Sequence, residues 1–574
     1  MFWVWVFLVA LVDCSARVQF KGRQLYVDNK PFEVRGVCYS PVPIGESPSY
    51  LPYGDYFTAK YAYMWSRDVP VMKAMGVNTV RIYGWDNSAD HSLFLDYLSS
   101  MDMYVLITYY LGTAHESPVN NATARNAIVT SFAEQVARYA GHSAVLMWSF
   151  GNELNGVWNG FVTAFSDANQ CGWTPSCLNN QDYRSHCVPQ ADCMYAGLFK
   201  WVNEAAAAAK AKADIPVVTG FADVDWMIGS TNHTLDKLKR NERFAPAVSA
   251  WGLQLYRGPT FTNAFSTFES ASNRGLLVTE YGVDAYNDPC VWPENVHNNM
   301  CFNVLGDPAG GASAPPGLPF VGCKDTKQWC HVPGEVAQAE WGKNLTQELI
   351  RASTEAGGVV AGGFIMAWAD EYWKNTAVQD MCRTPCPSAD IDKCRGADRA
   401  KYSIGGSAAC AQFSHITCGD ANTSYHDLCG YALGSAPDGY VNEAWFGLLQ
   451  PNTCGVEVGG GFRLDVVVPR PITGALAGLW GASISSINSS FSSCQDLKPC
   501  YDCLMAHTDE QLAETTACHV ACFGKSDLNP ADNWTTVYIV VGVASGAACV
   551  FVVCIFIAYN RKTKFLAEYN SSLL

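Results

Sequence analysis

The sequence predicts an α/β fold, a (β/α)8 TIM barrel with disulfide-rich loop insertions, and two observations predict it. Between residues 30 and 370, short runs rich in β-branched and aromatic residues alternate with Ala-rich amphipathic stretches, which is the pattern of βα units on a parallel sheet. There are eight such runs, and eight is the strand number of that barrel. They lie at 32–39, 79–83, 104–109, 145–150, 216–220, 250–256, 276–280 and 363–368.

Helices are expected between these runs. The amphipathic stretches lie at 66–75, 91–101, 124–139, 196–213, 261–272 and 334–356. Residues 442–449 (NEAWFGLL) are expected to return the chain and close the barrel with a final helix. The barrel with its Cys-rich insertions is therefore assigned to 17–450. The Cys-containing segment 451–534 is either a small folded module or a stalk, and the sequence leaves both open.

The composition fits a large folded domain and excludes two classes of protein. Of the 574 residues, 49% are hydrophobic and 16% are charged, so the chain has ample apolar surface for a core and is not mainly disordered. The net charge is −15, with no basic block beyond a short stretch near the end of the chain. Nucleic acid is excluded as a partner because the sequence has no electrostatic footing for it.

Both ends of the chain carry apolar segments. Residues 1–16 are an apolar run followed by small residues, typical of a signal peptide cleaved near Ala16; since the run lacks a leading positive charge, an uncleaved anchor is the alternative. Residues 537–558 are uncharged and long enough to cross a hydrocarbon core about 30 Å thick. The basic, polar stretch 559–574 predicts a cytoplasmic tail. We therefore expect a type I single-pass protein of the plasma membrane with its large domain at the cell surface.

The cysteines agree with an oxidising compartment. Of the 24 cysteines, Cys14 lies in the signal and Cys549 and Cys554 in the span, which leaves 21 outside the cell. An odd number implies at least one free thiol, and the isolated Cys38 is the candidate for a buried, unpaired one. Because no histidines accompany the cysteines at zinc spacing, disulfides are favoured over metal sites. The clusters lie at 171–193, 290–330, 382–429 and 454–522. Six external sequons indicate a glycoprotein: Asn121, Asn232, Asn344, Asn422, Asn488 and Asn533.

Two glutamates at the ends of predicted strands indicate chemistry on a glycosidic bond. Glu153 ends WSFGNE after the fourth strand, and Glu280 ends LLVTE at the seventh. Retaining cleavage of a glycosidic bond needs two carboxyl groups about 5–5.5 Å apart, one to protonate the leaving oxygen and one to attack the anomeric carbon. The carboxyl ends of barrel strands share one face, so these two side chains are expected to meet there. The alternative is that both glutamates merely end strands.

These two motifs resemble the paired signatures of clan A glycoside hydrolases. In that clan the acid/base glutamate follows strand four and the nucleophile follows strand seven. Within the clan the chain most resembles family 72, the β-1,3-glucanosyltransferases of fungal cell walls. The supporting residues occur in the same order: 32–37 (FEVRGV), 66–70 (SRDVP), 78–83 (NTVRIY), 90–92 (DHS), 102–105 (DMYV), 151–153 (GNE) and 279–282 (TEYG).

The resemblance implies a role for each matching residue. Glu153 is the expected general acid/base and Glu280 the nucleophile, with Asn152 hydrogen-bonded to the sugar 2-hydroxyl. Arg81 and Tyr256, at the ends of the second and sixth strands, match positions that steady the nucleophile, and a cation beside a carboxylate favours its charged form. The alternatives are an ordinary buried salt bridge for Arg81 and a packed barrel aromatic for Tyr256.

Aromatic residues at strand ends are candidates for binding sugar faces. Trp368 ends the eighth strand, and Tyr83 and Trp85 follow the second. Flat aromatic rings stack on the apolar faces of sugars, so these three are expected to bind substrate. Packing in the core or at the rim is the alternative, because 13% of the residues are aromatic.

The chain also departs from that family's pattern. It has Trp65 and Val283 where the family usually carries cysteines, and the stretches 284–335 and 375–440 are insertions. The disulfide framework is therefore expected to differ from that of the family. A transmembrane span also stands where many members carry a lipid anchor.

The expected function is that of a retaining β-glucan-active glycosidase or transglycosidase, most simply a β-1,3-glucanosyltransferase that remodels cell-wall glucan. No metal or cofactor is implied. The alternatives are an endo-β-glucanase or mannanase of the same clan, which would use water as acceptor, and a catalytically inactive glycan-binding surface receptor. One sequence does not separate water from sugar as the acceptor.

Overall fold

The structure of the chain is a computed structural model. It describes residues 17–43, 48, 52–111, 122–155, 188–223, 233–285, 320–322, 329–331, 334–354, 358–371, 431–432, 440–441, 446–458, 462–507 and 516–523. By its internal contacts the chain separates into residues 1–528 and residues 529–574. All described residues belong to the first unit.

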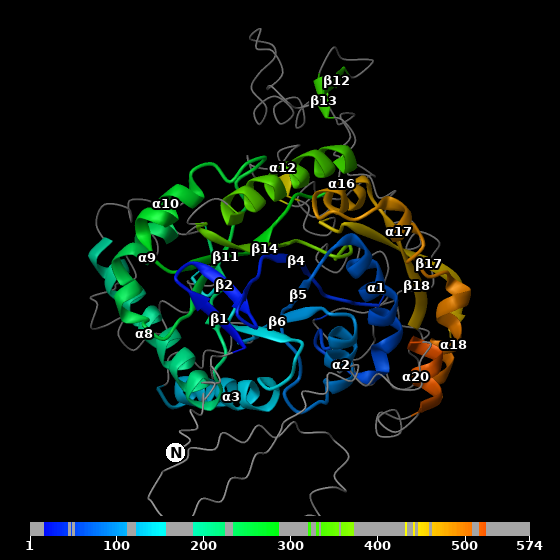
Figure 1. The fold of residues 1–574 in the computed structure, drawn as a ribbon, viewed down its shortest axis with the longest axis horizontal. Coiled ribbons are helices and arrows are strands. Elements are labelled where there is room, and N and C mark those ends of the chain that lie inside the picture. Colours follow the sequence, from blue (N-terminus) through cyan, green and yellow to red (C-terminus); the bar gives the residue numbers. More distant parts are fainter. Residues whose placement is uncertain are drawn as a thin grey trace, which may run out of the picture. The chain divides into compact units, whose positions relative to one another are not determined.

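A parallel sheet forms the centre of this unit (Figure 1). Its strands follow the order β8-β7-β6-β5-β4-β14-β11-β10-β9, and each neighbouring pair is parallel. The two edge strands, β8 and β9, are separated by two residues in the chain, so the sheet curls until its edges meet in one interrupted strand. This is consistent with the predicted barrel. The strands are β4 (Val34–Cys38), β5 (Thr79–Ile82), β6 (Tyr104–Tyr109), β7 (Val145–Phe150), β8 (Val217–Val218), β9 (Phe221–Ala222), β10 (Ala250–Gln254), β11 (Gly275–Tyr281) and β14 (Val360–Ile365).

Each of the eight predicted runs overlaps a strand of this sheet, and the fifth strand position is the one that is broken, into β8 and β9. The Gly252 N–H donates to the Thr219 hydroxyl at 3.1 Å, so a hydrogen bond to a side chain takes the place of a backbone hydrogen bond between the strands there. A Cβ at Gly252 would overlap the Thr219 carbonyl. A Cβ at Gly220 would lie 3.2 Å from an Arg81 nitrogen. The break therefore leaves room for the Arg81 guanidinium inside the sheet.

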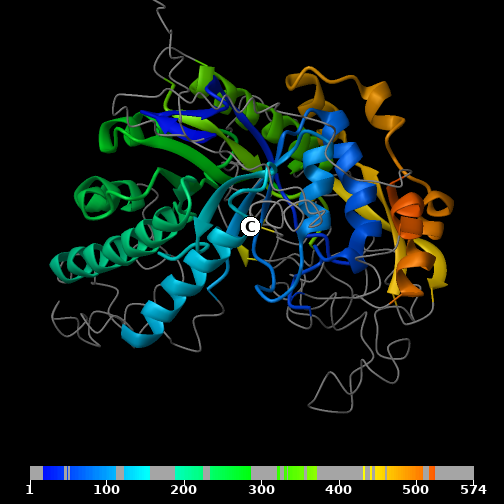
Figure 2. The same cartoon turned by 60° about the horizontal axis from the view of Figure 1, so that its bottom comes forward.

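Helices lie outside the strands, as Figures 1 and 2 show. The six predicted helices are all present, although α1 begins four residues and α8 eight residues earlier than expected. A short helix at 233–241 and the two 3-10 turns were not expected. The elements are η1 (Ala59–Tyr61), α1 (Ala62–Met75), α2 (Ser92–Ser100), α3 (Ala122–Tyr139), α8 (Val188–Lys212), α9 (His233–Asn241), η4 (Glu242–Phe244), α10 (Ala264–Ala271) and α12 (Gly334–Thr354).

Apolar side chains fill both faces of the sheet. Along β6, Val105 and Ile107 pack in the cluster shared with the helices, whereas Leu106 points to the cluster enclosed by the sheet. Leu277 of β11 lies in the enclosed cluster as well. Side chains alternate along a strand, so a sheet buried on both faces requires nearly continuous apolar runs. This explains why the strands could be recognised in the sequence as short apolar runs.

A small antiparallel sheet that the sequence did not predict lies at the amino ends of the strands of the parallel sheet. It consists of β1 (Val18–Lys21), β2 (Gln24–Val27) and β3 (Lys30–Pro31). Arg17 Nη2 donates to the Val145 carbonyl at the start of β7 at 2.6 Å. A Cβ at Gly275, the first residue of β11, would lie 2.9 Å from the Phe20 ring. This small sheet therefore covers the end of the parallel sheet opposite to Glu280.

The final helix is not where the sequence predicted it. Within the predicted segment 442–449, the structure describes 446–449, where Phe446 and Leu448 exchange backbone hydrogen bonds with Ala367 beside the end of β14. Leu449 already belongs to β17 (Leu449–Val458), which pairs with β18 (Phe462–Pro469), and the closing helix is α16 (Pro471–Leu479). Gly447 lies so close to the backbone of Asp370 that a Cβ would overlap it. This close pairing with the sheet overrides the local helical pattern, so the prediction was wrong.

The described part of the Cys-containing C-terminal segment packs on α1 as part of the same unit. The expected boundary between residues 450 and 451 falls inside β17. Arg67 of α1 and Asp465 of β18 form a buried ion pair of 2.5 Å, and the Trp65 and Phe523 rings stack at 5.3 Å. Phe523 therefore covers Trp65, one of the two positions where the related family usually carries a cysteine.

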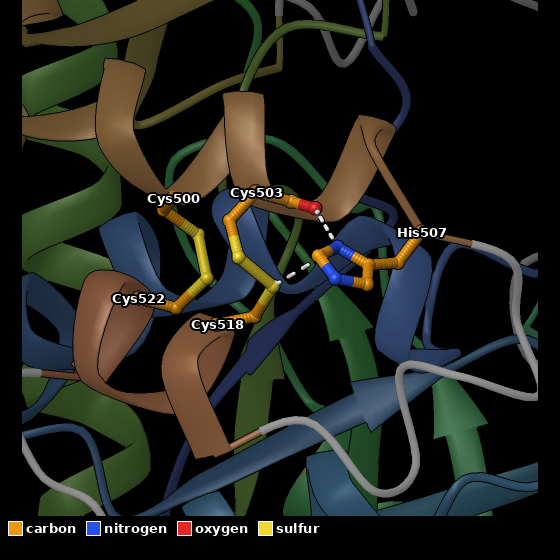
Figure 3. Close-up of a disulfide and its surroundings, with 5 residues drawn as sticks. All are labelled: Cys500, Cys503, His507, Cys518 and Cys522. Carbon is orange, nitrogen blue, oxygen red and sulfur yellow. Dashed lines mark hydrogen bonds between the residues drawn. A yellow bond between two sulfur atoms is a disulfide. The ribbon is translucent and has the colours of Figure 1, made fainter.

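Two disulfides join the last described helices (Figure 3). After α17 (Ile484–Asn488), α18 (Cys494–Met505) and α20 (Thr516–Phe523) are linked by the bridges Cys500–Cys522 and Cys503–Cys518. Cys193 and Cys494 are disulfide-bonded as well. We call α18, α20 and their two bridges the disulfide clasp. Its presence supports the oxidising compartment that the cysteine count predicted.

Several predictions concern segments outside the described residues. They include the signal 1–16, the span 537–558, the tail 559–574 and most of the Cys-rich insertions. Of the insertions, the structure describes two short hairpins, β12 (Phe320–Gly322) with β13 (Trp329–His331) and β15 (Tyr431–Ala432) with β16 (Tyr440–Val441). Among the helices it describes, none has both the length and the apolar character needed to span a membrane.

Candidate active site

Glu280 lies at the carboxyl end of β11 and accepts hydrogen bonds from four side chains. Its Oε1 accepts from Arg81 at 2.7 Å, Tyr83 at 2.6 Å and Gln254 at 2.8 Å. Its Oε2 accepts from Tyr256 at 2.9 Å. Glu280 is 6% exposed, and a buried carboxylate is tolerated when it is paired and hydrogen-bonded. The four donors come from the ends of β5 and β10, so the sheet itself assembles this cluster.

Arg81 is fully buried and connects Glu280 to the end of β7. Its Nη1 also donates to the Thr279 carbonyl at 2.9 Å, and its Nη2 donates to Asn152 Oδ1 at 2.6 Å. Burial alone would lower the pKa of Arg81, but Tyr83 and Glu280 raise it above its usual value. Arg81 is therefore a permanent cation beside the predicted nucleophile, in the position that the sequence implied for it.

Tyr83 has a different environment from the one predicted. Its hydroxyl donates to Glu280, and the Arg81 guanidinium lies 4.6 Å above its ring. Burial, together with Cys38 and Glu280, holds the pKa of Tyr83 well above its usual value, so the phenol stays a neutral donor. The Arg81 guanidinium thus occupies one face of the Tyr83 ring, so that face is not open to a sugar. In this structure Tyr83 anchors the carboxylate, a role that the sequence did not suggest.

The predicted acid/base residue lies on a tight turn after β7. Gly151 has φ 73° and Glu153 has φ 47°, and the left-handed region is uncommon for a glutamate. A Cβ at Gly151 would lie within 3 Å of the Leu154 side chain, so glycine is required at that step. The Glu153 N–H donates to the Gly220 carbonyl at 2.5 Å, in the break between β8 and β9. This turn holds Asn152 and Glu153, both half-buried, at the rim.

Tyr256 links the two predicted catalytic carboxylates. Burial is the main cause that raises the pKa of Tyr256 well above its usual value, and Glu280 and Glu153 both add to the increase. The two glutamates, 127 positions apart in the sequence, therefore act on the same phenol. Asn152 provides a second connection, since its Oδ1 accepts from Gln254, which also donates to Glu280. Gln254 and Asn152 therefore join Glu280 to the turn that carries Glu153.

The two predicted tryptophan platforms differ in their surroundings. Trp85 is half-buried, and its indole stacks on the His91 ring with centroids 4.0 Å apart and planes at 6°. His91 in turn contacts both oxygens of Asp55 at 3.0 and 3.1 Å. Trp368 is 1% exposed and packs in the core cluster, so it offers little ring surface in this structure. Trp85 is the better placed of the two, and both roles stay predictions.

Gln254 is a further residue that holds Glu280 at this site. Gln254, which donates to both Glu280 and Asn152, was not predicted. A period of two along β10 places Gln254 on the same side as Tyr256, and that signal was available in the sequence.

Cys38 is buried and unpaired, as predicted, and its Sγ lies 3.6 Å from the Thr279 carbonyl. Burial raises the pKa of Cys38 to about 12, so its thiol is neutral and unreactive.

One group of three potential metal ligands meets within the described part of the chain. Cys503, His507 and Cys518 place their ligand atoms within 4.8 Å of one another (Figure 3). The two sulfur atoms are joined in a disulfide, and metals bind thiolates. His507 Nδ1 also lies 2.7 Å from the Cys503 carbonyl oxygen. In this oxidised state the group does not fit a metal ion.

Comparisons with known proteins point to the family that the motifs indicate. Residues 8–183 match a family model described as glucanosyltransferase, of glycoside hydrolase family 72. The 1,3-beta-glucanosyltransferase gas5 of Schizosaccharomyces pombe is 29% identical over 150 residues, which cover 25% of this chain and 28% of that protein. The 1,3-beta-glucanosyltransferase GAS5 of Saccharomyces cerevisiae is 31% identical over 140 residues, which cover 24% of this chain and 27% of that protein. The match thus spans less than a third of the length of either relative.

A solved structure extends the comparison at a low level. Saccharomyces cerevisiae Gas2p in complex with laminaritriose and laminaritetraose is 14% identical, with 81% of this chain and 68% of that chain covered and a TM-score of 0.37. A likeness of this size carries no argument about fold or function. The resemblance rests on the sequence comparisons alone. Over residues 8–183 the chain resembles the glucanosyltransferases of family 72, which confirms what its motifs predicted.

Proposed function

We propose that this protein is a retaining β-glucan transglycosidase, most specifically a β-1,3-glucanosyltransferase that acts on cell-wall glucan. The observation that carries the proposal is the Glu280 carboxylate held by four donors beside the turn that carries Asn152 and Glu153. The names of the relatives over the matched region support the same substrate class. No cofactor or metal takes part, because both half-reactions use side chains alone.

In the first half-reaction Glu280 attacks the anomeric carbon through Oε2. Three donors surround Oε1, whereas among the described residues Oε2 accepts from Tyr256 alone and keeps a lone pair for the sugar. The bond from C1 to the glycosidic oxygen breaks while the bond from C1 to Oε2 forms. Glu153 gives its proton to the leaving oxygen. Asn152 binds the sugar 2-hydroxyl, a contact that strengthens in the transition state.

In the second half-reaction an acceptor hydroxyl gives its proton to Glu153 and attacks C1, and the ester to Glu280 breaks. For transfer, a sugar hydroxyl must reach the glycosyl-enzyme faster than water at about 55 M, which requires binding energy in the acceptor subsites. Trp85, half-buried and stacked on His91, is proposed as a platform in such a subsite. Trp368 is proposed to bind substrate as well, although it needs a change in its surroundings to do so.

The closure of the sheet and the location of the protein are part of the same proposal. We infer that the curled sheet is a closed (β/α)8 barrel. The signal 1–16, the span 537–558 and the tail 559–574 would place it outside the cell on a type I single-pass anchor. Cell-surface glucan is then the polymer within reach.

The test combines trapping with product analysis. An activated β-glucoside should leave a sugar on Glu280 that mass spectrometry of peptic peptides locates, and millimolar laminarin oligosaccharides should yield longer chains. Shorter products alone would instead indicate an endo-β-glucanase, and cleavage of mannan oligosaccharides a mannanase. Neither products nor a trapped sugar, together with retained binding, would indicate an inactive glycan receptor. A sugar trapped on another residue would refute the assignment of the nucleophile.

A further inference from the structure

Gln254 and Asn152 are two amide side chains whose orientations are determined by their charged neighbours. Nitrogen and oxygen of an amide are distinguished by their hydrogen-bond partners. The Gln254 amide lies 2.8 Å from Glu280 Oε1, and an ionised carboxylate only accepts hydrogen bonds. Gln254 must therefore turn its NH2 group toward Glu280.

The orientation of Asn152 follows from the same reasoning. Its amide faces Arg81 Nη2 at 2.6 Å and Gln254 Nε2 at 2.6 Å, and both of these are donors. Both contacts therefore reach Asn152 Oδ1. The NH2 group of Asn152 must point away from the cluster, and Asn152 is half-buried at the rim, where a substrate would approach.

Gln254 is held in this orientation although its own oxygen gains nothing from it. The side chain is 1% exposed, and its Oε1 has no hydrogen-bond partner in the part of the chain that the structure describes. A buried acceptor without a partner is unfavourable. The two donor contacts of Nε2, to Glu280 and Asn152, are the interactions that offset this cost.

We propose that Gln254 is a positioning residue that couples the nucleophile to the contact between Asn152 and the sugar 2-hydroxyl. With one NH2 group it holds Oε1 of Glu280, which leaves Oε2 for attack, and it turns the Asn152 amide so that its NH2 group faces the substrate. The proposal rests on the proposed function of Glu280 and Asn152. It adds that the preference for a 2-hydroxyl depends on a residue that does not touch the sugar.

The test is a cycle between Gln254 and the substrate 2-hydroxyl. Two aryl β-laminaribiosides with a good leaving group are used, one intact and one without the 2-hydroxyl on the reacting sugar. Release of the aryl group by the full-length protein reports the glycosylation step. The ratio of kcat/KM between the two substrates is the 2-hydroxyl preference.

Gln254→Met, similar in length and without donors, should lower kcat/KM on the intact substrate about 10- to 100-fold. It should also reduce the 2-hydroxyl preference about fivefold or more, because the Asn152 amide is no longer held. Gln254→Leu is the second variant, in case the first does not fold. Leucine has no donor for Glu280 and Asn152, so the preference should fall in the same way.

The matched control is Gln338→Met. Gln338 of α12 is also a buried glutamine, but its Nε2 donates to the backbone carbonyls of Val283 and Gly447. This variant should lose thermal stability and keep the 2-hydroxyl preference of the wild type. Folding of every variant is checked by its melting temperature.

The outcomes separate this inference from the function on which it rests. If folded Gln254 variants lose activity equally on both substrates, Gln254 acts on Glu280 alone and the coupling is refuted. If Gln338→Met also lowers the preference, the effect is general loosening and the inference is again refuted. If the wild type releases no aryl group from either substrate, the proposed function itself fails.

Discussion

The cluster around Glu280 and the disulfide clasp are held together in opposite ways. In the cluster, hydrogen bonds between 2.6 and 2.9 Å join side chains that lie up to 199 positions apart in the sequence, and the parallel sheet brings them together. In the clasp, two covalent bonds join helices whose linked cysteines are 22 and 15 positions apart. The first region is positioned by the whole sheet, and the second by local crosslinks together with ring contacts to α1.

The difference shows which forces suit which task. A nucleophile needs donors placed to within a fraction of an ångström, and these have to come from several rigid strands. A short helical pair on the surface has little core of its own, so disulfides stabilise it mainly by restricting the unfolded chain. We therefore expect the two regions to respond independently to mutation and to redox conditions.

The largest expected effect is that of Glu280→Gln. Turnover on unactivated glucan should fall by several orders of magnitude, because one half-reaction loses its nucleophile. The free energy of unfolding should also fall, by about 3–5 kcal/mol at most, because Arg81 keeps its charge and loses its partner. Product assays and urea unfolding measure the two effects.

Glu153→Gln is the matched variant for this prediction. It should lower turnover on glucan to a similar extent, with little change in stability, because Glu153 is half-buried on the rim. On a substrate with a good leaving group Glu153→Ala should still accumulate the glycosyl-enzyme, and Glu280→Ala should not. The reverse pattern would exchange the two roles.

The next effect concerns the clasp. Replacing Cys503 and Cys518 by serine should lower the free energy of unfolding by about 3 kcal/mol, the entropy expected for a loop of this length. The rate of aryl release should stay within about twofold of the wild type. Chemical unfolding and stopped-flow release measure these quantities. A large loss of glycosylation rate together with the loss of stability would show that the two regions are coupled, and this would contradict the prediction.

A smaller effect is expected from Cys38 at alkaline pH. The folded thiol has a pKa of about 12 because it is buried, against a usual value of 9.0. The unfolded chain therefore loses this proton first, and the stability contributed by Cys38 declines as pH rises from about 9 towards 12. Between pH 8 and pH 10 the wild type should lose about 1.4 kcal/mol more than Cys38→Ala in urea unfolding.

This alkaline prediction has an independent check. Cys38 should resist iodoacetamide in the folded protein at pH 8 and react after unfolding, because its thiol is buried and protonated. Peptide mass spectrometry detects the label. Rapid labelling of the native protein would mean that the thiol is accessible, and the stability argument would then not apply.

The smallest expected effect is that of Trp85→Ala. Removal of this platform should shift products from longer glucans toward hydrolysis, because the acceptor loses binding energy. The glycosylation step should stay within about tenfold of normal, which corresponds to about 1.4 kcal/mol in transition-state binding. Chromatography of laminarin products and aryl release measure the two steps. An unchanged ratio of transfer to hydrolysis would remove Trp85 from the acceptor site.

Much of the fold could be predicted because it depends on patterns close together in the chain. The eight strands were recognisable as short apolar runs, since both faces of a parallel sheet are buried. Glu153 and Glu280 could be singled out because each lies at or just after the end of such a run. The helix expected at 442–449 failed because its backbone pairs with Ala367, a partner about 80 positions away that no local pattern indicates.

By itself the sequence determined the strands, most of the helices, the pair of glutamates and the free, buried Cys38. These depend on side-chain periodicity and residue type, which are local properties. The tertiary structure alone decided that Tyr83 anchors Glu280, that Gln254 joins Glu280 to Asn152, and that Phe523 covers Trp65. The physical reason is that a hydrogen bond or ring contact depends on which strands and helices become neighbours. That choice is made by packing of the whole unit and is not encoded in any short stretch of the chain.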